Sequence, residues 1–256
     1  SKDKNGAWWR PLPPYTKHQS AIGGVMVNAH FDSVSTGYGA TDDGVGVVTS
    51  LQIIKYFTSK GNQPERGIVV LFNNNEEDGL LGAKAFMSHE MASFVYKFLN
   101  LEGAGAGGRA TLFRSTDLEV TRAYSHSPYP FGTVISADGF SLGLIKSETD
   151  YAVFRARGYH GLDVAFWQPR SRYHTDQDDA KHTSKASIWH MLSASVETLK
   201  YLTTDKTFAI NTQEYNQNTR FKHSKGVDGV WFDLFGRLFV IFSLRTLFAW
   251  SLLLLI

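Results

Sequence analysis

Residues 67–82 read GIVVLFNNNEEDGLLG, an apolar run that ends in two adjacent glutamates and a glycine-bearing turn. The apolar part predicts a buried strand, and the glycines mark the turn that follows it. Glu76 and Glu77 repel each other there, and burial disfavours both charges, so a nearby cation would offset both costs. Because neighbouring side chains on extended backbone point in different directions, one carboxylate can bind a metal while the other acts as a general base. Taken alone, the triplet also fits a solvated acidic loop.

Further histidine and carboxylate side chains follow strand-like segments or lie in loops. His30 lies in GGVMVNAHFDS, Asp42 in GYGATDDGVG, Glu102 in FLNLEG and His174 in SRYHTDQDD. In an open α/β sheet, ligands collect at the carboxyl ends of the strands. Imidazole nitrogens and carboxylate oxygens are suitable zinc ligands without any thiolate. A pair of catalytic metal ions needs about this inventory, including one carboxylate that bridges both ions.

Each of these residues also has a purely structural interpretation. A histidine such as His30, after an apolar strand, can simply be hydrogen-bonded in the core. Asp42 and Asp43 can be turn and N-cap residues of the helix that follows them. Glu102, beside a glycine-rich run, can be an ordinary loop carboxylate. The order of the motifs along the chain favours the ligand interpretation.

Five segments in this order resemble the co-catalytic di-zinc exopeptidases: AHFDS, GATDDGVG, NEEDGLLG, NLEG and YHTDQDD. That family contains aminopeptidases, glutamate carboxypeptidase and the transferrin receptor. The matching segments extend from His30 to Asp179. Within the family, GGVMVNAHFDSVSTGYGATDDGVGVV and FLNLEGAGAGGR are most similar to the fungal vacuolar membrane proteases.

The resemblance implies two zinc ions as cofactors and a ligand set for each. It implies that one zinc is bound by His30 and Glu102, that the other is bound by Glu77 and His174, and that Asp42 bridges them. Family members often carry a non-proline cis peptide after the bridging aspartate, which corresponds to Asp42–Asp43.

The resemblance also implies roles for residues around the ligands. Glu76 is expected to act as general base and then as the acid that protonates the leaving amine. Tyr173 resembles a tyrosine that stabilises the oxyanion of the tetrahedral intermediate. Asp32 is expected to accept the other ring N–H of His30 and so fix its tautomer. Asp150 resembles an aspartate that supports the ligands from behind, and Phe154 a packing aromatic.

Composition restricts the remaining possibilities. The chain has 256 residues and a net charge of +2, with no basic patch that would indicate a nucleic-acid partner. It has no cysteine, which excludes disulfides, thiolate metal sites and a cysteine nucleophile. Alternating strands and helices predict an α/β three-layer sandwich, with a mixed, mostly parallel sheet flanked by helices. Strands are expected at 68–73, 98–102, 110–114 and 161–167, and helices at 43–60, 80–97, 117–124 and 184–203. In the first helix, the expected core-facing stripe is Val47, Val48, Leu51, Ile54 and Phe57.

The chain divides into three expected parts: a zinc peptidase domain at 1–204, a polar linker at 205–228 and a membrane-spanning segment at 229–256. From Leu238 onward almost every residue is apolar, and Arg245 is the only charge. Such a run has about the ~20 residues that cross a bilayer as a helix. A buried helix at the domain edge is the alternative. The short stretch before His30 and the apolar end suggest truncation at both termini.

These observations lead to one expected function. The chain is expected to be a membrane-anchored zinc metalloexopeptidase, and specifically an aminopeptidase acting on peptides through a water between the two zinc ions. The resemblance places it in the vacuolar membrane with the peptidase domain in the lumen. The alternatives are a one-zinc glutaminyl-peptide cyclase, a glutamate-type carboxypeptidase and a non-catalytic receptor-like homologue.

Overall fold

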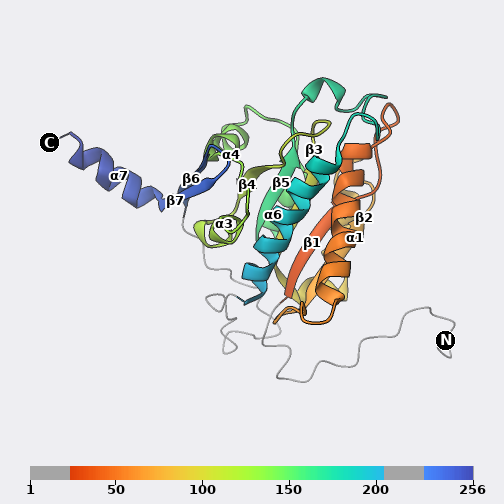
Figure 1. The fold of residues 1–256 in the computed structure, drawn as a ribbon, viewed down its shortest axis with the longest axis horizontal. Helices are drawn as coiled ribbons and strands as arrows, with labels where there is room; N and C mark the ends of the chain where they lie inside the picture. Colours follow the sequence, from red (N-terminus) through yellow and green to blue (C-terminus); the bar gives the residue numbers. More distant parts are fainter. Residues whose placement is uncertain (1–23, 205–227, 256) are drawn as a thin grey trace.

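The computed structural model describes residues 24–204 and 228–255. The predicted linker therefore lies almost wholly outside the described residues. Five strands form the main sheet in the order β2 (Ile68–Asn73), β1 (Gly24–His30), β3 (Val95–Gly103), β5 (His160–Phe166) and β4 (Thr111–Ser115). The first four run parallel, and β4 is antiparallel to β5 (Figure 1). This confirms the predicted mixed, mostly parallel sheet.

Helices cover both faces of the sheet. On one face lie α1 (Val45–Thr58), α3 (Leu118–Tyr124) and α6 (Lys185–Thr204), and Figure 1 shows α1 and α6 side by side in front of the strands. On the other face α2 (Leu81–Phe86) packs with α5 (Asp150–Ala156). α4 (Val134–Ser141) contacts β4.

The alternation of side chains along each strand separates two hydrophobic cores. On β1, Val25 and Val27 belong to the core under α1 and α6, whereas Met26 belongs to the core under α2 and α5. On β3, Leu99 belongs to the core under α1 and α6, and Phe98 belongs to the core under α2 and α5. Successive residues of a strand point to opposite faces, so buried parallel strands must be apolar on both sides. The three-layer prediction is confirmed.

Two predicted helices differ from the structure. In α1 the expected stripe is only partly confirmed: Phe57 is buried, but Val48, Leu51 and Ile54 are exposed, and Ser50 and Ile53 are buried instead. The small Ser50 lets the helix lie close to its neighbours, and apolar spacing alone does not indicate that preference. The expected helix at 80–97 is also too long. α2 ends at Phe86, a 3₁₀ turn, η2, covers Glu90–Ser93, and β3 begins at Val95, because pairing with β1 takes these residues into the sheet.

The C-terminal part differs most from the expectation. β6 (Gly229–Leu234) and β7 (Leu238–Ser243) form an antiparallel hairpin, and α7 (Leu244–Leu253) follows. Trp231 is buried, and its ring lies 6.1 Å from that of Phe239, which in turn contacts Tyr124 of α3. The expectation of one apolar helix from Leu238 is therefore wrong for the residues of β7. Phe239 and Ile241 of this strand are partly buried against the protein core, and an apolar run looks the same in sequence whether protein or lipid covers it.

Across residues 24–204 and 228–255, no helix combines the length and the apolar character that a membrane crossing requires. The predicted start of a transmembrane helix is thus not confirmed. α7 has ten residues, and it carries large exposed apolar side chains, among them Phe248, Trp250 and Leu253.

Candidate metal centre

The predicted ligands meet at the carboxyl end of the parallel sheet. His30 is the last residue of β1, Glu102 lies near the end of β3, and Glu77 follows β2. Asp42 lies in the turn η1 (Ala40–Gly44) before α1, and His174 follows the short turn η3 (Arg170–Arg172) beyond β5. Parallel strands bring these ends to one edge, where the backbone of the following loops can present ligands.

The five side chains form two groups that share Asp42. In the first group, His30 Nε2 lies 3.2 Å from Asp42 Oδ1 and 3.4 Å from Glu102 Oε2. In the second group, His174 Nε2 lies 3.2 Å from Asp42 Oδ2 and 3.1 Å from Glu77 Oε2. The two carboxylate oxygens of Asp42 thus face different histidines, as a bridging ligand requires.

These separations fit zinc. A tetrahedral zinc ion with bonds of about 2.0–2.1 Å holds two ligand atoms about 3.3 Å apart. Within the described part of the chain, three buried atoms of the second group make no hydrogen bond: Asp42 Oδ2, Glu77 Oε1 and His174 Nε2. Buried polar atoms are normally paired, so this donor set is arranged for a ligand rather than for itself. The residues present fit a two-zinc centre.

The crowding of buried carboxylates in the cluster also favours the binding of cations. Burial, together with the charge of Glu102, raises the pKa of Glu76 to about 10. Burial likewise raises the pKa of Glu77 to about 6, with the charge of Asp42 adding to it, and the pKa of Glu102 to about 7. Burial alone would lower the pKa of His30, but the carboxylates of Glu102, Asp42 and Asp43 together outweigh burial and raise that pKa well above its ordinary value. Crowded, buried carboxylates of this kind are stabilised by bound metal.

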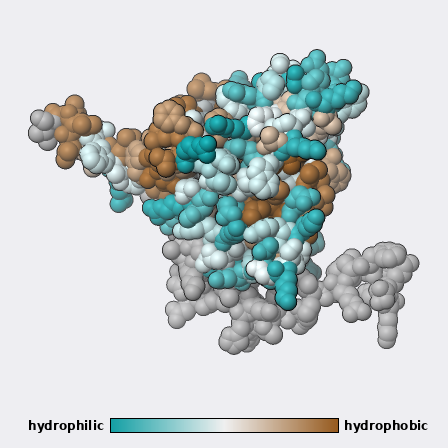
Figure 2. Space-filling view, viewed as in Figure 1, coloured by the Kyte–Doolittle hydropathy of each residue, from teal (hydrophilic) through white to brown (hydrophobic). Residues whose placement is uncertain are grey.

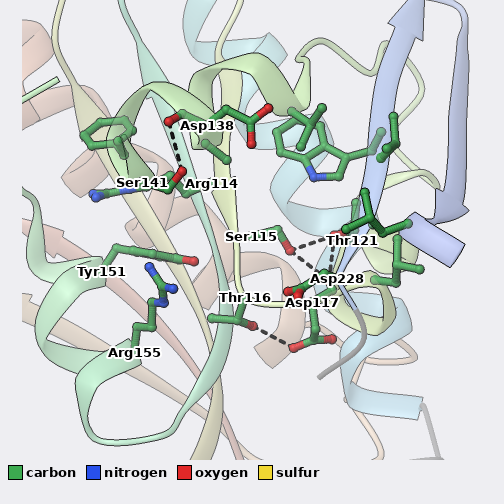
Figure 3. Close-up of a pocket in the computed structure, with 18 of the residues that line it drawn as sticks. Arg114, Ser115, Thr116, Asp117, Thr121, Asp138, Ser141, Tyr151, Arg155 and Asp228 are labelled. Carbon is green, nitrogen blue, oxygen red and sulfur yellow. Dashed lines mark hydrogen bonds between the residues drawn. The ribbon is translucent and has the colours of Figure 1, made fainter. Parts of the chain in front are cut away.

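A cavity of about 510 Å³ opens onto the ligands. Asp42, Glu76 and Glu102 line its floor, and its walls are largely apolar, formed by Phe113, Phe140, Leu144, Ile145 and Trp167. A larger cavity of about 870 Å³ lies between α3, α4, α5 and β6, and Figure 3 shows the residues around it. None of the predicted ligands lines that larger cavity, so the smaller one is the candidate active site.

Tyr173 borders the same cavity. Its ring stacks on that of His174, with 3.7 Å between the centroids, and the Arg170 guanidinium lies 4.1 Å from the Tyr173 centroid. No hydrogen bond from its hydroxyl is seen among the described residues, which leaves that group able to donate into the cavity. This position is compatible with the oxyanion role that the resemblance implies.

The residues expected around the ligands lie close to them. His30 Nδ1 is 3.0 Å from the Asp32 backbone oxygen and 3.6 Å from its carboxylate, so the backbone oxygen is the nearer acceptor. The Asp32 carboxylate instead accepts from the Glu77 backbone N–H at 3.3 Å. The Asp42–Asp43 peptide bond is cis, as the resemblance implied.

Asp43 and Asp150 support the ligands without facing them. Asp43 accepts from the backbone N–H of His30 at 3.2 Å and, like a helix cap, from that of Gly46 at 3.0 Å. Asp150 is buried behind His30, where it accepts from the side-chain amides of Asn28 and Asn73. Phe154 is buried against Phe98, the packing role expected of it.

Sequence reasoning favours a solvated acidic loop for Asp178, with a supporting role as the alternative, and it missed a second set of supporting residues. Asp178 is buried, and its carboxylate accepts from the backbone N–H groups of Thr41 at 2.8 Å and of Asp42 at 3.1 Å, which holds the bridging residue in place. The other set is the polar residues inside the strands, such as Asn28 and Asn100. Each lies two positions before a ligand in an otherwise apolar strand, and that spacing could have revealed them.

Comparison with known sequences agrees with this geometry. Residues 15–199 match peptidase family M28. A vacuolar membrane protease of Botryotinia fuckeliana is 67% identical over 259 residues, which cover 100% of this chain and 25% of that protein. The chain thus spans about a quarter of the length of this curated relative.

Solved structures share the fold at low sequence identity. A zinc aminopeptidase from Bacillus subtilis superposes with a TM-score of 0.52 at 21% identity, over 75% of this chain and 48% of that one. An Acidobacteriales bacterium glutaminyl cyclase superposes with a TM-score of 0.51 at 18% identity, over 71% of this chain and 70% of that one. The fold alone therefore does not separate a peptidase from a cyclase.

Proposed function

Because the chain belongs to peptidase family M28, we propose that it is the catalytic part of a zinc-dependent aminopeptidase. The observation that carries this proposal is the pair of ligand groups sharing Asp42, each with one histidine and one glutamate. Zinc bound there supplies Lewis-acid polarisation of the scissile carbonyl and lowers the pKa of the attacking water.

The chain's own side chains have separate roles in the proposed reaction. Glu76 lies on the floor of the cavity beside Asp42 and Glu102 but belongs to neither ligand group, so it is free to move a proton. It takes the proton from the attacking water and later delivers it to the leaving nitrogen. Tyr173 donates a hydrogen bond to the developing oxyanion. The apolar walls of the cavity exclude bulk water and receive the substrate's side chain.

Both ligand groups are complete, as a two-zinc peptidase requires, but a one-zinc cyclase of this fold keeps much of the same ligand set. The 67% identical relative that is named a protease favours the peptidase over the cyclase alternative. The same completeness argues against a receptor-like homologue that has lost its ligands. In the proposed function, the free α-amino group of the peptide contacts one metal position. This contact restricts cleavage to the first peptide bond, and such cleavage is aminopeptidase activity.

We also propose that the protein acts at the vacuolar membrane, with the peptidase domain in the lumen. The name of the Botryotinia relative supports this location. The exposed apolar side chains of α7 support membrane attachment, and Figure 2 shows them on the arm that projects from the domain. The membrane segment itself remains a proposal.

The test combines zinc content with activity on aminoacyl and N-blocked substrates. Two zinc ions per folded chain and release of the N-terminal residue from unblocked peptides only are expected. One tightly bound zinc with pyroglutamate formation would instead indicate a cyclase. A folded protein that binds no zinc would refute the proposed function.

A further inference from the structure

A row of buried polar side chains crosses four strands of the sheet. On β1 and β3 it lies two residues before the metal ligands His30 and Glu102. In the strand register, Asn28 of β1 lies opposite Asn100 of β3, Asn100 opposite Asp163 of β5, and Asp163 opposite Arg114 of β4. These four residues are named the polar row, and all are buried. Asn100 lies two positions before Glu102, so both side chains project from the same face of β3.

The members of the polar row are joined by hydrogen bonds. Asn28 Nδ2 donates to Asn100 Oδ1 at 2.6 Å, and Asn100 Nδ2 donates to Asp163 Oδ1 at 3.0 Å. Arg114 Nε donates to the other oxygen of Asp163 at 2.9 Å. A buried polar group is costly unless it is paired, and these bonds join each member of the row to its neighbour, although Asn28 Oδ1 has no hydrogen-bond partner among the described residues.

The ion pair at the end of the polar row determines how the Asn100 amide is turned. Paired with the Arg114 guanidinium at 2.8 Å, the Asp163 carboxylate can only accept hydrogen bonds. Asn100 must therefore direct its NH₂ group toward Asp163 and its oxygen toward Asn28. A reversed amide would place two oxygens in contact on one side and two NH₂ groups in contact on the other.

The same NH₂ group reaches a metal ligand. Asn100 Nδ2 lies 3.2 Å from Glu102 Oε1 and donates to it, while Glu102 Oε2 faces His30 Nε2 at 3.4 Å. One oxygen of Glu102 is thus held by the polar row, and the other is left for the metal position. Hydrogen-bond partners behind a metal ligand orient it, and their loss typically weakens metal binding about 10- to 100-fold.

We propose that the polar row is the positioning device of Glu102: Arg114 holds Asp163, Asp163 turns the Asn100 amide, and Asn100 presents Glu102 to its zinc through one oxygen. This inference rests on the proposed two-zinc function. Asn100 and Arg114 are positioning residues, since neither touches the substrate position or the metal position directly.

Arg114 has a second set of contacts, of which Asn100 shares only Thr149, whose Oγ1 lies 3.2 Å from Asn100 Nδ2. Its guanidinium donates to Glu148 at 2.6 Å and to Thr149 at 2.9 Å, and it lies 3.9 Å from the Phe140 ring. All three of these residues line the active-site cavity. Figure 3 shows Arg114 and Tyr151 on the same side of the larger cavity, so Arg114 stands between the two cavities. Changes at Asn100 therefore test the polar row with less disturbance of the cavity wall.

The test measures zinc affinity, with zinc alone as the probe, in two single-site backgrounds. His174→Ala leaves the group of His30, Asp42 and Glu102, and His30→Ala leaves the other group. Asn100→Leu has a similar volume but removes the NH₂ donor. In the His174→Ala background it should weaken zinc binding about 10- to 100-fold. In the His30→Ala background it should leave the zinc affinity unchanged.

A matched control separates positioning from general destabilisation. Asp117→Asn breaks a different buried pair, the 2.6 Å contact between Asp117 and His160. It should lower the free energy of unfolding and leave zinc affinity unchanged in both backgrounds. If Asn100→Leu does not fold, Arg114→Lys keeps the positive charge but loses the paired geometry, and it should show the same selectivity with a smaller loss.

Two results would overturn the inference. One is an unchanged zinc affinity in the His174→Ala background. The other is an equal loss in both backgrounds, which is the result expected if the polar row only sets the strand register. A wild-type protein that binds no zinc would refute the proposed function, and this inference with it. Two bound ions with an unselective response would refute this inference alone.

Discussion

Replacement of the proposed general base, Glu76→Gln, is the most direct test of the catalytic assignment. The side chain is 7% exposed on the cavity floor, and an amide of the same shape fills its place without taking a proton. General-base catalysis typically contributes about 10²- to 10⁴-fold, so kcat/KM should fall by that factor. The corresponding rise in the barrier is about 2.7–5.4 kcal/mol at 1.36 kcal/mol for each tenfold change. Zinc content should not change, because Glu76 belongs to neither ligand group.

The same variant should also change the stability of the metal-free protein. Burial and the charge of Glu102 raise the pKa of Glu76 from 4.5 to about 10. Between these values the folded chain retains a proton that the unfolded chain releases, so Glu76 lowers the free energy of unfolding progressively as pH rises. With a chelator present, Glu76→Gln should be at least as stable as wild type at pH 7. Its Tm should also fall less between pH 5 and pH 9.

The assay is hydrolysis of aminoacyl-p-nitroanilides, with zinc measured by atomic absorption on the same samples. Glu77→Gln is the matched control, because the neighbouring glutamate is a proposed ligand and its loss should lower zinc content. Activity of Glu76→Gln within tenfold of wild type would refute the general-base role. A loss of activity that is accompanied by loss of zinc would make Glu76 a ligand instead.

Three further changes test the bridging ligand, a buried pair and the core. Asp42→Ala should reduce zinc content from two ions toward none, because both ligand groups contain Asp42, and retention of two ions would exclude a bridge. Burial would raise the pKa of Asp117, but its hydrogen bonds, first of all the one with His160, lower that pKa below 3.8. The ionised Asp117 carboxylate therefore stabilises the folded protein at pH 7, and this stabilisation is lost as the pH falls below 3.8. Asp117→Asn should therefore cost about 1.5–3 kcal/mol in urea unfolding at pH 7 and much less in strong acid, and an equal cost at both would contradict the ion pair. Leu99→Ala in the fully buried centre of β3 should cost about 2–5 kcal/mol in the same assay while zinc content stays unchanged; a smaller cost would mean that the core collapses around the missing side chain.

Strand positions were predictable because buried parallel strands have a strong local signal. The apolar run before Glu76 is β2, and GLDVAFW is β5 to within one residue. The proposed ligands followed from motifs at the ends of these runs and from the family resemblance that these motifs carry. Helices were less predictable. The apolar residues of α1 lie at helical spacing, yet the buried face is set by close packing against the sheet and α6, which periodicity does not describe.

The apolar C-terminal run shows that hydrophobicity alone does not predict which surface covers an apolar segment. From Leu238 its composition fits a membrane helix, but β7 pairs with β6 and packs Phe239 against Trp231 and Tyr124. Hydrophobicity measures only the preference to leave water. Which surface receives the side chains depends on elements that lie far away in the sequence.

By itself, the sequence determined the α/β class, the positions of most strands and the inventory of candidate ligands, because these depend on local periodicity and on the chemistry of residue types. The resemblance also implied the two ligand groups around Asp42, and only the tertiary structure decided how the polar row lies behind Glu102. The hydrogen-bonded neighbours among Asn28, Asn100, Asp163 and Arg114 are 49 to 72 positions apart in the chain. Their contact exists only because strand register aligns them across the sheet, and register is a property of paired strands rather than of any one segment.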